Sequence, residues 1–278
     1  MVKRSLSGSW NLEILGDSPF SGERLKARIP GSVYSALLDA GKIPDPHWRD
    51  NELEALKIMD NDFAFTHDFD IEGDGFNAEK ILLICEGLDT LCDLELNGEK
   101  IGYADNMHRT WEFDITKRVK NNGNELKLTF RSPTKYIAER HSEIFVDGTP
   151  DAMRGFTQIR KAHCMFGWDW GPRLPDAGIW RDISVGYVSE ARLESVYVTQ
   201  NHVMGGDMEC GDGPCVSSVE LNFEIECSGS CGGVEITVTA PDGTVYKTGS
   251  RGTVLLLPQE AEEPSPCFLS YTQCRRVR

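Results

Sequence analysis

The residue types best suited to ligand chemistry gather in one short stretch, residues 166–172, which reads FGWDWGP. A carboxylate between two indoles, with glycine on both sides and proline behind, favours a shaped loop over a helix or a central strand. Trp168 and Trp170 each offer a broad apolar face and one N–H donor, whereas Asp169 accepts hydrogen bonds through two oxygens. The trio therefore suits a ligand with C–H faces and hydroxyl edges, such as a sugar.

A structural role is the alternative for the same three residues. One tryptophan would then fill the core, and Asp169 would cap a turn. For a single tryptophan in a soluble domain this is the commoner case. The residues alone leave both interpretations open.

Length and composition limit the number of domains and the kinds of partner that the chain can have. The 278 residues, 40% of them hydrophobic, are enough for one or two ordinary cores, so two domains are expected. With 29 Lys and Arg against 44 Asp and Glu, the formal charge is -15. Such a chain repels nucleic acids and anionic membranes, which makes both unfavourable partners, while a neutral sugar is unaffected.

The N-terminus has two basic residues but no apolar run behind them that could form a signal peptide, and no stretch is long enough to span a bilayer. These features predict a cytoplasmic location. Nine cysteines is an odd number for such a chain, so most are expected to be reduced. Four of them, Cys210, Cys215, Cys227 and Cys231, are interpreted as reduced thiols, with a zinc site or two disulfides as alternatives.

The elements that must position the aromatic stretch begin with a short helix over 33–41, capped by Ser32 and ended by Gly41. The segment 43–52, with two prolines around Trp48, is interpreted as an ordered surface loop. From there to residue 132 the apolar period is two, which is typical of strands.

Two strand signals in this part are specific. The run 81–85 is continuously apolar, as expected for a strand covered on both faces. Asn97-Gly98 between two alternating segments is a strong signal for a tight hairpin. Many short strands with little helix predict an all-β sandwich.

A brief helix is expected over 133–141, followed by about forty residues with little strand pattern. Long loops in compact domains are usually functional or disordered, and the five aromatic residues between 156 and 180 argue against disorder. The segment 180–187 then returns the chain to the sandwich. The aromatic stretch thus lies on a long loop held by a rigid sheet.

The composition changes near residue 190. Alternating apolar residues over 190–257 predict the early strands of a second, smaller sandwich, whereas 258–278 has no periodicity and is expected to be an unstructured tail. An incomplete sandwich leaves unpaired edges and apolar faces, so this half is expected to be unstable or to associate.

Several motifs together resemble the β-mannosidases of the second glycoside hydrolase family over roughly residues 5–250. The strongest is the run from Arg160 to Pro172, RKAHCMFGWDWGP, which is specific to that branch. Further matching stretches are SGSW at 7–10, PGSV at 30–33, GKIPDP at 41–46, NE at 51–52, GLDT at 87–90, NG at 97–98, DNM at 105–107 and WEFDI at 111–115. The motif GIWR at 178–181 is looser and is similar to one found across the wider family.

The resemblance implies a jelly-roll (galactose-binding-like) sandwich over 1–189, an immunoglobulin-like sandwich, and then a TIM barrel that carries two catalytic glutamates. It also implies that Trp168 and Asp169 contact a terminal mannose, with Asp169 accepting hydrogen bonds from hydroxyl groups. Trp170 is carried over as a weaker candidate with packing as its alternative, and Arg160 and Lys161 are expected to hold the loop. No metal or organic cofactor is implied.

The expected function follows from the catalytic carboxyl groups that the family requires and from the part of the family architecture that this chain is expected to contain. Retaining glycosidases use two carboxyl groups roughly 5 Å apart, and we expect this chain to end before the barrel that would hold them. It would then be the N-terminal part of an exo-acting β-mannosidase, inactive alone, whose partners are a β-mannoside glycan and the missing barrel. The alternatives are a stand-alone lectin-like binding module and a truncated product without a function in isolation.

Overall fold

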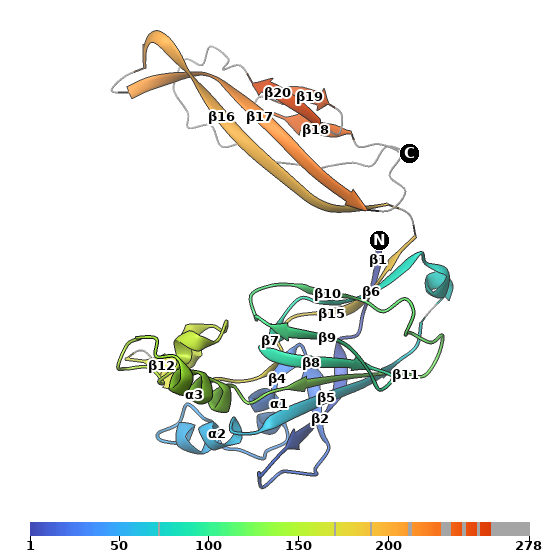
Figure 1. Ribbon diagram of the computed structural model, residues 1–278, viewed down its shortest axis with the longest axis vertical. Helices are drawn as coiled ribbons and strands as arrows, with labels where there is room; N and C mark the ends of the chain where they lie inside the picture. Colours follow the sequence, from blue (N-terminus) through green and yellow to red (C-terminus); the bar gives the residue numbers. More distant parts are fainter. Residues whose placement is uncertain are drawn as a thin grey trace. The chain divides into compact units, whose positions relative to one another are not determined.

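The computed structural model describes residues 1–71, 73–169, 171–189, 191–210, 213–228, 235–240, 243–248 and 251–256. These residues divide into two compact units, one formed by residues 2–189 and the other by the described residues from 191 onward. Figure 1 shows that both units are built mainly from strands and that the described helices belong to the first. The prediction of an all-β protein is confirmed.

Two antiparallel sheets of the first unit form a β-sandwich (Figure 1). The four-stranded sheet has the order β1-β15-β6-β10, with the bounds Val2–Ser5, Ile183–Val188, Lys80–Cys85 and Trp111–Asp114. The six-stranded sheet has the order β3-β2-β5-β11-β8-β9, with the bounds Leu25–Ile29, Gly8–Leu15, Asp62–Phe69, Asn124–Phe130, Leu91–Leu96 and Glu99–Asp105. Because β1 pairs with β15, the first and last strands of this jelly-roll unit lie side by side.

The core between the two sheets follows from the alternation of side chains along the strands. In β11, Leu126, Leu128 and Phe130 are fully buried, and the residues between them face outward. β6 is buried over five consecutive residues, as its uninterrupted apolar sequence predicts for a strand covered on both faces. Inward side chains of both sheets join in one continuous core.

The turn between β8 and β9 is the hairpin that the Asn97-Gly98 pair predicts. Asn97 has a φ of 55° and Gly98 a φ of 82°, so both adopt the left-handed conformation that such a turn requires. The two residues therefore fix the register of β8 against β9.

Three helices accompany the sandwich, with the bounds Val33–Asp39 for α1, Glu52–Ile58 for α2 and Pro133–Glu143 for α3. The predicted cap of α1 is confirmed, because the Ser32 side chain accepts a hydrogen bond from the Ser35 N–H at 3.2 Å. α3 runs two residues beyond the predicted end. The structure differs from the sequence-based prediction at α2. The prolines of 43–52 indicate only a loop, whereas a helix begins at Glu52, where that loop ends. None of the described helices has the length and apolar character needed to cross a membrane.

Short elements occupy the segment that the sequence patterns leave without regular structure. A three-stranded sheet has the order β4-β14-β7, with the bounds Gly31–Ser32, Gly178–Ile179 and Leu88–Asp89. A two-stranded hairpin consists of β12, Phe166–Trp168, and β13, Gly171–Arg173. The 3-10 helices are η1, Gly73–Asn77, η2, Phe156–Gln158, and η3, His163–Met165. The aromatic stretch is therefore a small β-hairpin rather than an irregular loop.

The second unit contains two sheets in its described part. β16, Arg192–Cys210, pairs with β17, Gly213–Ser228, which pairs with β20, Arg251–Leu256, while β18, Ile236–Thr239, pairs with β19, Val245–Thr248. Its buried apolar side chains come from β17 and β18, namely Val219, Leu221, Phe223, Ile236 and Val238. The tail expected over 258–278 lies outside the described residues, as does Cys231.

Candidate functional site

Two of the three predicted ligand residues, Trp168 and Asp169, lie at the tip of the β12–β13 hairpin. Phe166 pairs with Arg173 and Trp168 with Gly171, so the chain reverses direction between Trp168 and Gly171. Trp168 is 38% exposed and is therefore not a core residue. Asp169 is also exposed, and no described residue donates a hydrogen bond to its carboxylate. Trp170 lies outside the described residues.

The base of the hairpin is held by apolar packing. Phe166 is fully buried in a small cluster with Leu91, Ile137, Phe156 and Ile159, separate from the main core. The Phe166 and Phe156 ring centroids are 6.3 Å apart. One end of the hairpin thus belongs to a packed layer, while the tip with its indole and carboxylate projects from it.

A charged anchor holds the second strand of the hairpin to α2. The Arg173 guanidinium donates to Glu52 Oε1 at 2.7 Å, and the Arg173 backbone N–H donates to Glu52 Oε2 at 3.0 Å. Burial alone would raise the pKa of Glu52, but the hydrogen bonds from Arg173 hold that pKa below its ordinary value. Glu52 belongs to the NE motif at 51–52, but no sequence pattern pairs it with Arg173, so its role could not be predicted.

Gly167, in the first strand of the hairpin, packs closely against the Arg173 side chain of the second strand. It has a φ of +84°, and a Cβ added there would lie 2.5 Å from Arg173 Cγ. Glycine meets both demands, since it adopts positive φ easily and leaves room for the arginine stem. The glycine before the tryptophan is therefore required by the contact between the two strands.

A second, buried anchor involves Lys161, which precedes the hairpin. Lys161 is 1% exposed, and its ammonium pairs with the carboxylate of Asp89 in β7. The same ammonium donates to the backbone carbonyl of Asp176 at 2.6 Å. Burial holds the pKa of Lys161 below its ordinary value, although the charge of Asp89 opposes this shift. These contacts agree with the expectation that Lys161 holds the loop.

Arg160 contributes through its main chain. The Met107 N–H donates to the Arg160 carbonyl at 3.0 Å, and the Ala162 N–H approaches Met107 Sδ at 2.9 Å. The Arg160 side chain is exposed. The segment that precedes the hairpin is therefore fixed to the loop that carries the DNM motif.

Asp176 lies where the segment rejoins the sandwich. Its Oδ1 atom accepts hydrogen bonds from the N–H groups of Tyr34 at 3.1 Å and Ala177 at 2.8 Å. Burial of the carboxyl group raises the pKa of Asp176 to about 6, although these donors and the charge of Lys161 act in the opposite direction. The residue as a whole stays partly exposed. Sequence reasoning assigns it no role.

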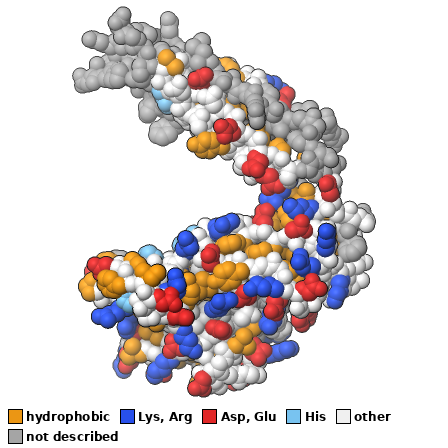
Figure 2. Space-filling model, in the orientation of Figure 1, with side chains coloured by type: hydrophobic (Ala, Val, Ile, Leu, Met, Phe, Trp, Pro, Cys, Tyr) orange, Lys and Arg blue, Asp and Glu red, His pale blue; other side chains and the backbone are white. Residues whose placement is uncertain are grey.

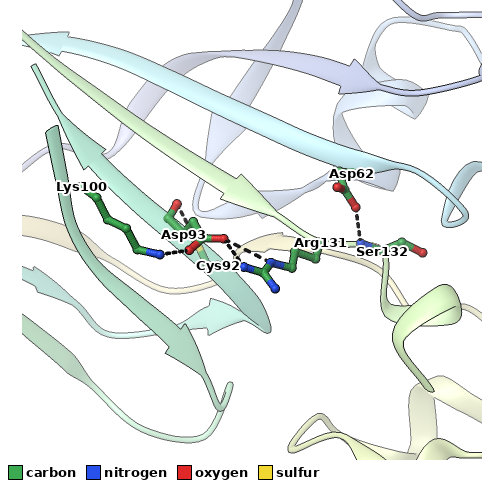
Figure 3. A network of polar contacts seen from close by, with 6 residues as sticks. All are labelled: Asp62, Cys92, Asp93, Lys100, Arg131 and Ser132. Atoms are coloured by element: carbon green, nitrogen blue, oxygen red, sulfur yellow. Dashed lines mark hydrogen bonds and ion pairs between the residues drawn. The ribbon is translucent and has the colours of Figure 1, made fainter. Parts of the chain in front are cut away.

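The polar network in Figure 3 fixes the start of α3, the helix whose Ile137 packs in the same cluster as Phe166. The Arg131 guanidinium donates to Asp93 Oδ2 at 2.7 Å, and Lys100 donates to Asp93 Oδ1 at 2.6 Å. The next residue, Ser132, donates its N–H to Asp62 at 2.8 Å. The end of β11 and the start of α3 are thus tied to the sandwich on both sides.

Apolar side chains are exposed at the end of the first unit that carries the hairpin (Figure 2). Figure 2 shows hydrophobic side chains gathered at the end of the first unit where Figure 1 places α3 and β12. Just after α3, Ile144, Phe145 and Val146 are 54%, 73% and 42% exposed. Exposed apolar residues that follow one another in this way mark an interaction surface more often than single ones do.

Other candidate features lie apart from the hairpin. Trp48 is 62% exposed on its surface loop, in agreement with the loop interpretation of 43–52. A surface pocket of about 300 Å³ next to β3 and the end of α1 is lined by Lys26, Arg28 and Asp39, among others, and contains none of the predicted ligand residues. In the part of the chain that the structure describes, no group of three or more His, Cys, Asp or Glu side chains could hold a metal ion.

Comparison with known proteins places this arrangement in a family. The family described as glycosyl hydrolase 2 galactose-binding domain-like matches residues 10–181, a range that contains β12, β13 and both anchors. The chain belongs to this family. The predicted resemblance to the second glycoside hydrolase family is confirmed.

Individual relatives of this family member are β-mannosidases. The chain is 36% identical to β-mannosidase of Bos taurus over 261 residues, covering 90% of this chain and 28% of the relative. It is 34% identical to β-mannosidase of Mus musculus over 252 residues, covering 88% of this chain and 27% of the relative. The chain therefore spans less than a third of the length of these curated relatives.

Solved structures agree. The crystal structure of β-D-mannosidase from Dictyoglomus thermophilum superposes with a TM-score of 0.73 at 28% identity, covering 92% of this chain and 30% of that one. β-Glucuronidase of Bifidobacterium dentium superposes with a TM-score of 0.59 at 15% identity and shows a shared fold.

Proposed function

We propose that this chain supplies one wall of the sugar pocket of a retaining exo-β-mannosidase, and that Trp168 and Asp169 are its ligand-contacting side chains. The observation that carries this proposal is the hairpin tip. An exposed indole and a carboxylate with no hydrogen-bond donor among the described residues stand next to each other. The strands behind them are fixed by Phe166 and by the pair formed by Glu52 and Arg173.

The chemistry of a sugar explains why these two groups belong together. The C–H face of a pyranose packs on an indole, and a carboxylate accepts two hydrogen bonds from neighbouring hydroxyl groups. No described residue donates a hydrogen bond to Asp169, and its exposed position lets a ligand approach. The role proposed for the two residues is to bind and orient a terminal β-mannose.

Bond cleavage is assigned to a different part of the family architecture. A retaining glycosidase needs an acid/base carboxyl and a nucleophilic carboxylate about 5 Å apart. The resemblance implies that both lie on a TIM barrel, and the exposed apolar residues 144–146 after α3 offer a surface against which further protein can pack. On this proposal the chain alone binds a mannoside weakly and does not hydrolyse it.

Ligand-observed saturation-transfer NMR with methyl β-D-mannopyranoside tests the binding role. We expect a signal with the wild-type chain that is lost in Trp168→Ala and in Asp169→Ala. Trp48→Ala is the matched control, because it removes another exposed tryptophan, and it should keep the signal. Equal signals from all four proteins would contradict the proposal.

The same titration separates the proposal from a stand-alone lectin-like module. Pockets that bind small ligands tightly enclose most of the ligand surface, which a single wall does not do. We expect a dissociation constant of about 1 mM or weaker for the chain alone. A constant of about 10 µM or tighter would favour the lectin-like alternative.

A further inference from the structure

A single hydrogen bond joins the two ends of the segment that carries the hairpin. The Lys161 ammonium donates to the Asp176 carbonyl across fifteen residues of sequence, at 2.6 Å. The intervening residues include η3, β12, the exposed tip and β13. One side chain therefore closes the base of the whole segment 161–176.

The same ammonium ties this base to the sandwich. Asp89, its carboxylate partner, belongs to β7, and Asp89 pairs with Gly178 of β14, two residues beyond Asp176. The other oxygen of the Asp89 carboxylate accepts a hydrogen bond from the Thr90 hydroxyl. A buried ion pair is stable only when its remaining hydrogen-bonding capacity is met, and here both members have further partners.

The strands of the hairpin are short. Its ladder consists of two residue pairs, and an isolated two-stranded hairpin of this kind is marginally stable in water. Phe166 is buried at one end, but Trp168 and Asp169 extend beyond the packed layer. Closing the base of the segment lowers the number of conformations that the tip can adopt.

We propose that Lys161 is a positioning residue: with Asp89 and the Asp176 carbonyl it forms a clasp that closes segment 161–176 and thereby orients Trp168 and Asp169. The part of this inference that concerns the sugar rests on the proposed function, whereas the part that concerns the order of the hairpin does not. Burial of the clasp supports it, since a lysine and an aspartate inside the protein keep a fixed mutual geometry.

Three variants test the clasp. Lys161→Met removes the ammonium and leaves Asp89 buried without its partner, so it should lower both the melting temperature and the order of the hairpin. Asp89→Asn/Lys161→Met removes both charges and should recover much of the melting temperature. Leu128→Ala is the control for stability alone, because Leu128 is fully buried in the sandwich core.

Hydrogen exchange of the backbone amides of residues 166–173 is the decisive measurement. We expect about a tenfold loss of protection in Lys161→Met and in the double variant, relative to amides of β11 in the same protein. Leu128→Ala should lower the melting temperature without this selective loss. If the double variant recovers hairpin protection together with its melting temperature, Lys161 is only a contributor to stability and the clasp is overturned.

The saturation-transfer signal of methyl β-D-mannopyranoside provides the second readout. A folded double variant that loses both hairpin protection and the mannoside signal supports the clasp and its effect on ligand binding. A double variant that loses hairpin protection but keeps the signal overturns the effect on the ligand. If the wild-type chain gives no signal while hairpin protection still depends on Lys161, the proposed sugar function fails and the clasp stands.

Discussion

Two aspartates near the hairpin differ in their surroundings, and so in their expected roles. Asp169 is exposed at the tip of the hairpin. The Asp176 carboxyl lies inside, where burial raises its pKa to about 6 and the charged form is disfavoured. The first is suited to recognition and the second to structure.

Replacing Asp169 tests recognition in a catalytic setting. In a chimera where this chain replaces the matching part of bovine β-mannosidase, Asp169→Ala should lower kcat/KM by about 2 to 4 kcal/mol, because hydrogen bonds to a buried ligand are lost. Asp68→Ala, which removes an exposed carboxylate on β5, should leave kcat/KM unchanged. A loss of only a few tenths of a kcal/mol for Asp169→Ala would show that this carboxylate does not contact the sugar.

Asp176 predicts a pH dependence of stability. Its folded-state pKa of about 6 exceeds the ordinary 3.8, so the folded state holds this proton more tightly than the unfolded chain does. The stabilisation is present below pH 4 and is lost as the pH rises towards 6. The Lys161 ammonium is the charge that faces Asp176, and burial raises the pKa of the neighbouring Tyr34, which keeps this phenol neutral.

The side chain introduced by Asp176→Asn cannot ionise, so this variant should not lose stability as the pH rises from 4 towards 6. Between pH 4 and pH 7 its free energy of unfolding, measured with urea, should rise relative to wild type by about 1 to 3 kcal/mol. Parallel pH profiles for the two proteins would show that the carboxyl group titrates normally in the folded state.

At the scale of elements, the hairpin depends on contacts between segments far apart in sequence. Regular strands, the Asn97-Gly98 turn and the cap at Ser32 are predictable because each follows from neighbouring residues. The pairs Glu52–Arg173 and Asp89–Lys161 join residues 121 and 72 positions apart, and no local pattern connects them. The sequence thus identifies the tip of the candidate site, but only the fold identifies what holds it.

The partly buried Glu52–Arg173 anchor is testable by itself. Glu52→Gln keeps one acceptor but removes the charge, so the amides of residues 166–173 should exchange faster while stability falls by only about 0.3 to 1 kcal/mol. Glu54→Gln is the matched control in the same helix, since Glu54 forms an ion pair with Lys57, three residues away, at 2.7 Å. Similar exchange in both variants would show that the anchor does not order the hairpin.

The same anchor has a defined pH window. Hydrogen bonds from Arg173 lower the pKa of Glu52. The stabilisation that this ion pair gives to the hairpin is therefore fully present at pH values above the ordinary pKa of glutamate. It is lost as the pH falls through the lowered folded-state pKa. Hairpin protection in the wild-type chain should therefore be constant from pH 6 to pH 8 and decrease in acid.

At the scale of the molecule, the two units have separate cores, which predicts that the first folds alone. All six tryptophans of the chain lie in residues 2–189, so tryptophan fluorescence reports on that unit. Residues 2–189 expressed alone should unfold at the same urea midpoint as in the full chain. A lower midpoint would show that the first unit depends on the second for stability.

The wider function also belongs to this scale. Membership of the family is shown, whereas a cytoplasmic location and a partnership with a catalytic barrel stay predictions, since the chain spans under a third of its curated relatives. Release of 4-nitrophenol from its β-D-mannoside by the purified chain measures the expected lack of turnover. Activity that co-purifies with the chain through every step would contradict that expectation.

The buried and exposed thiols of the first unit have a practical consequence. Cys85 and Cys92 are buried, and burial raises the pKa of both thiols, so neither is expected to react with alkylating reagents. Cys164, in η3 just before the hairpin, is exposed. Residues 2–189 would therefore accept one maleimide dye at a single place beside the hairpin, where its emission could follow a sugar as it arrives.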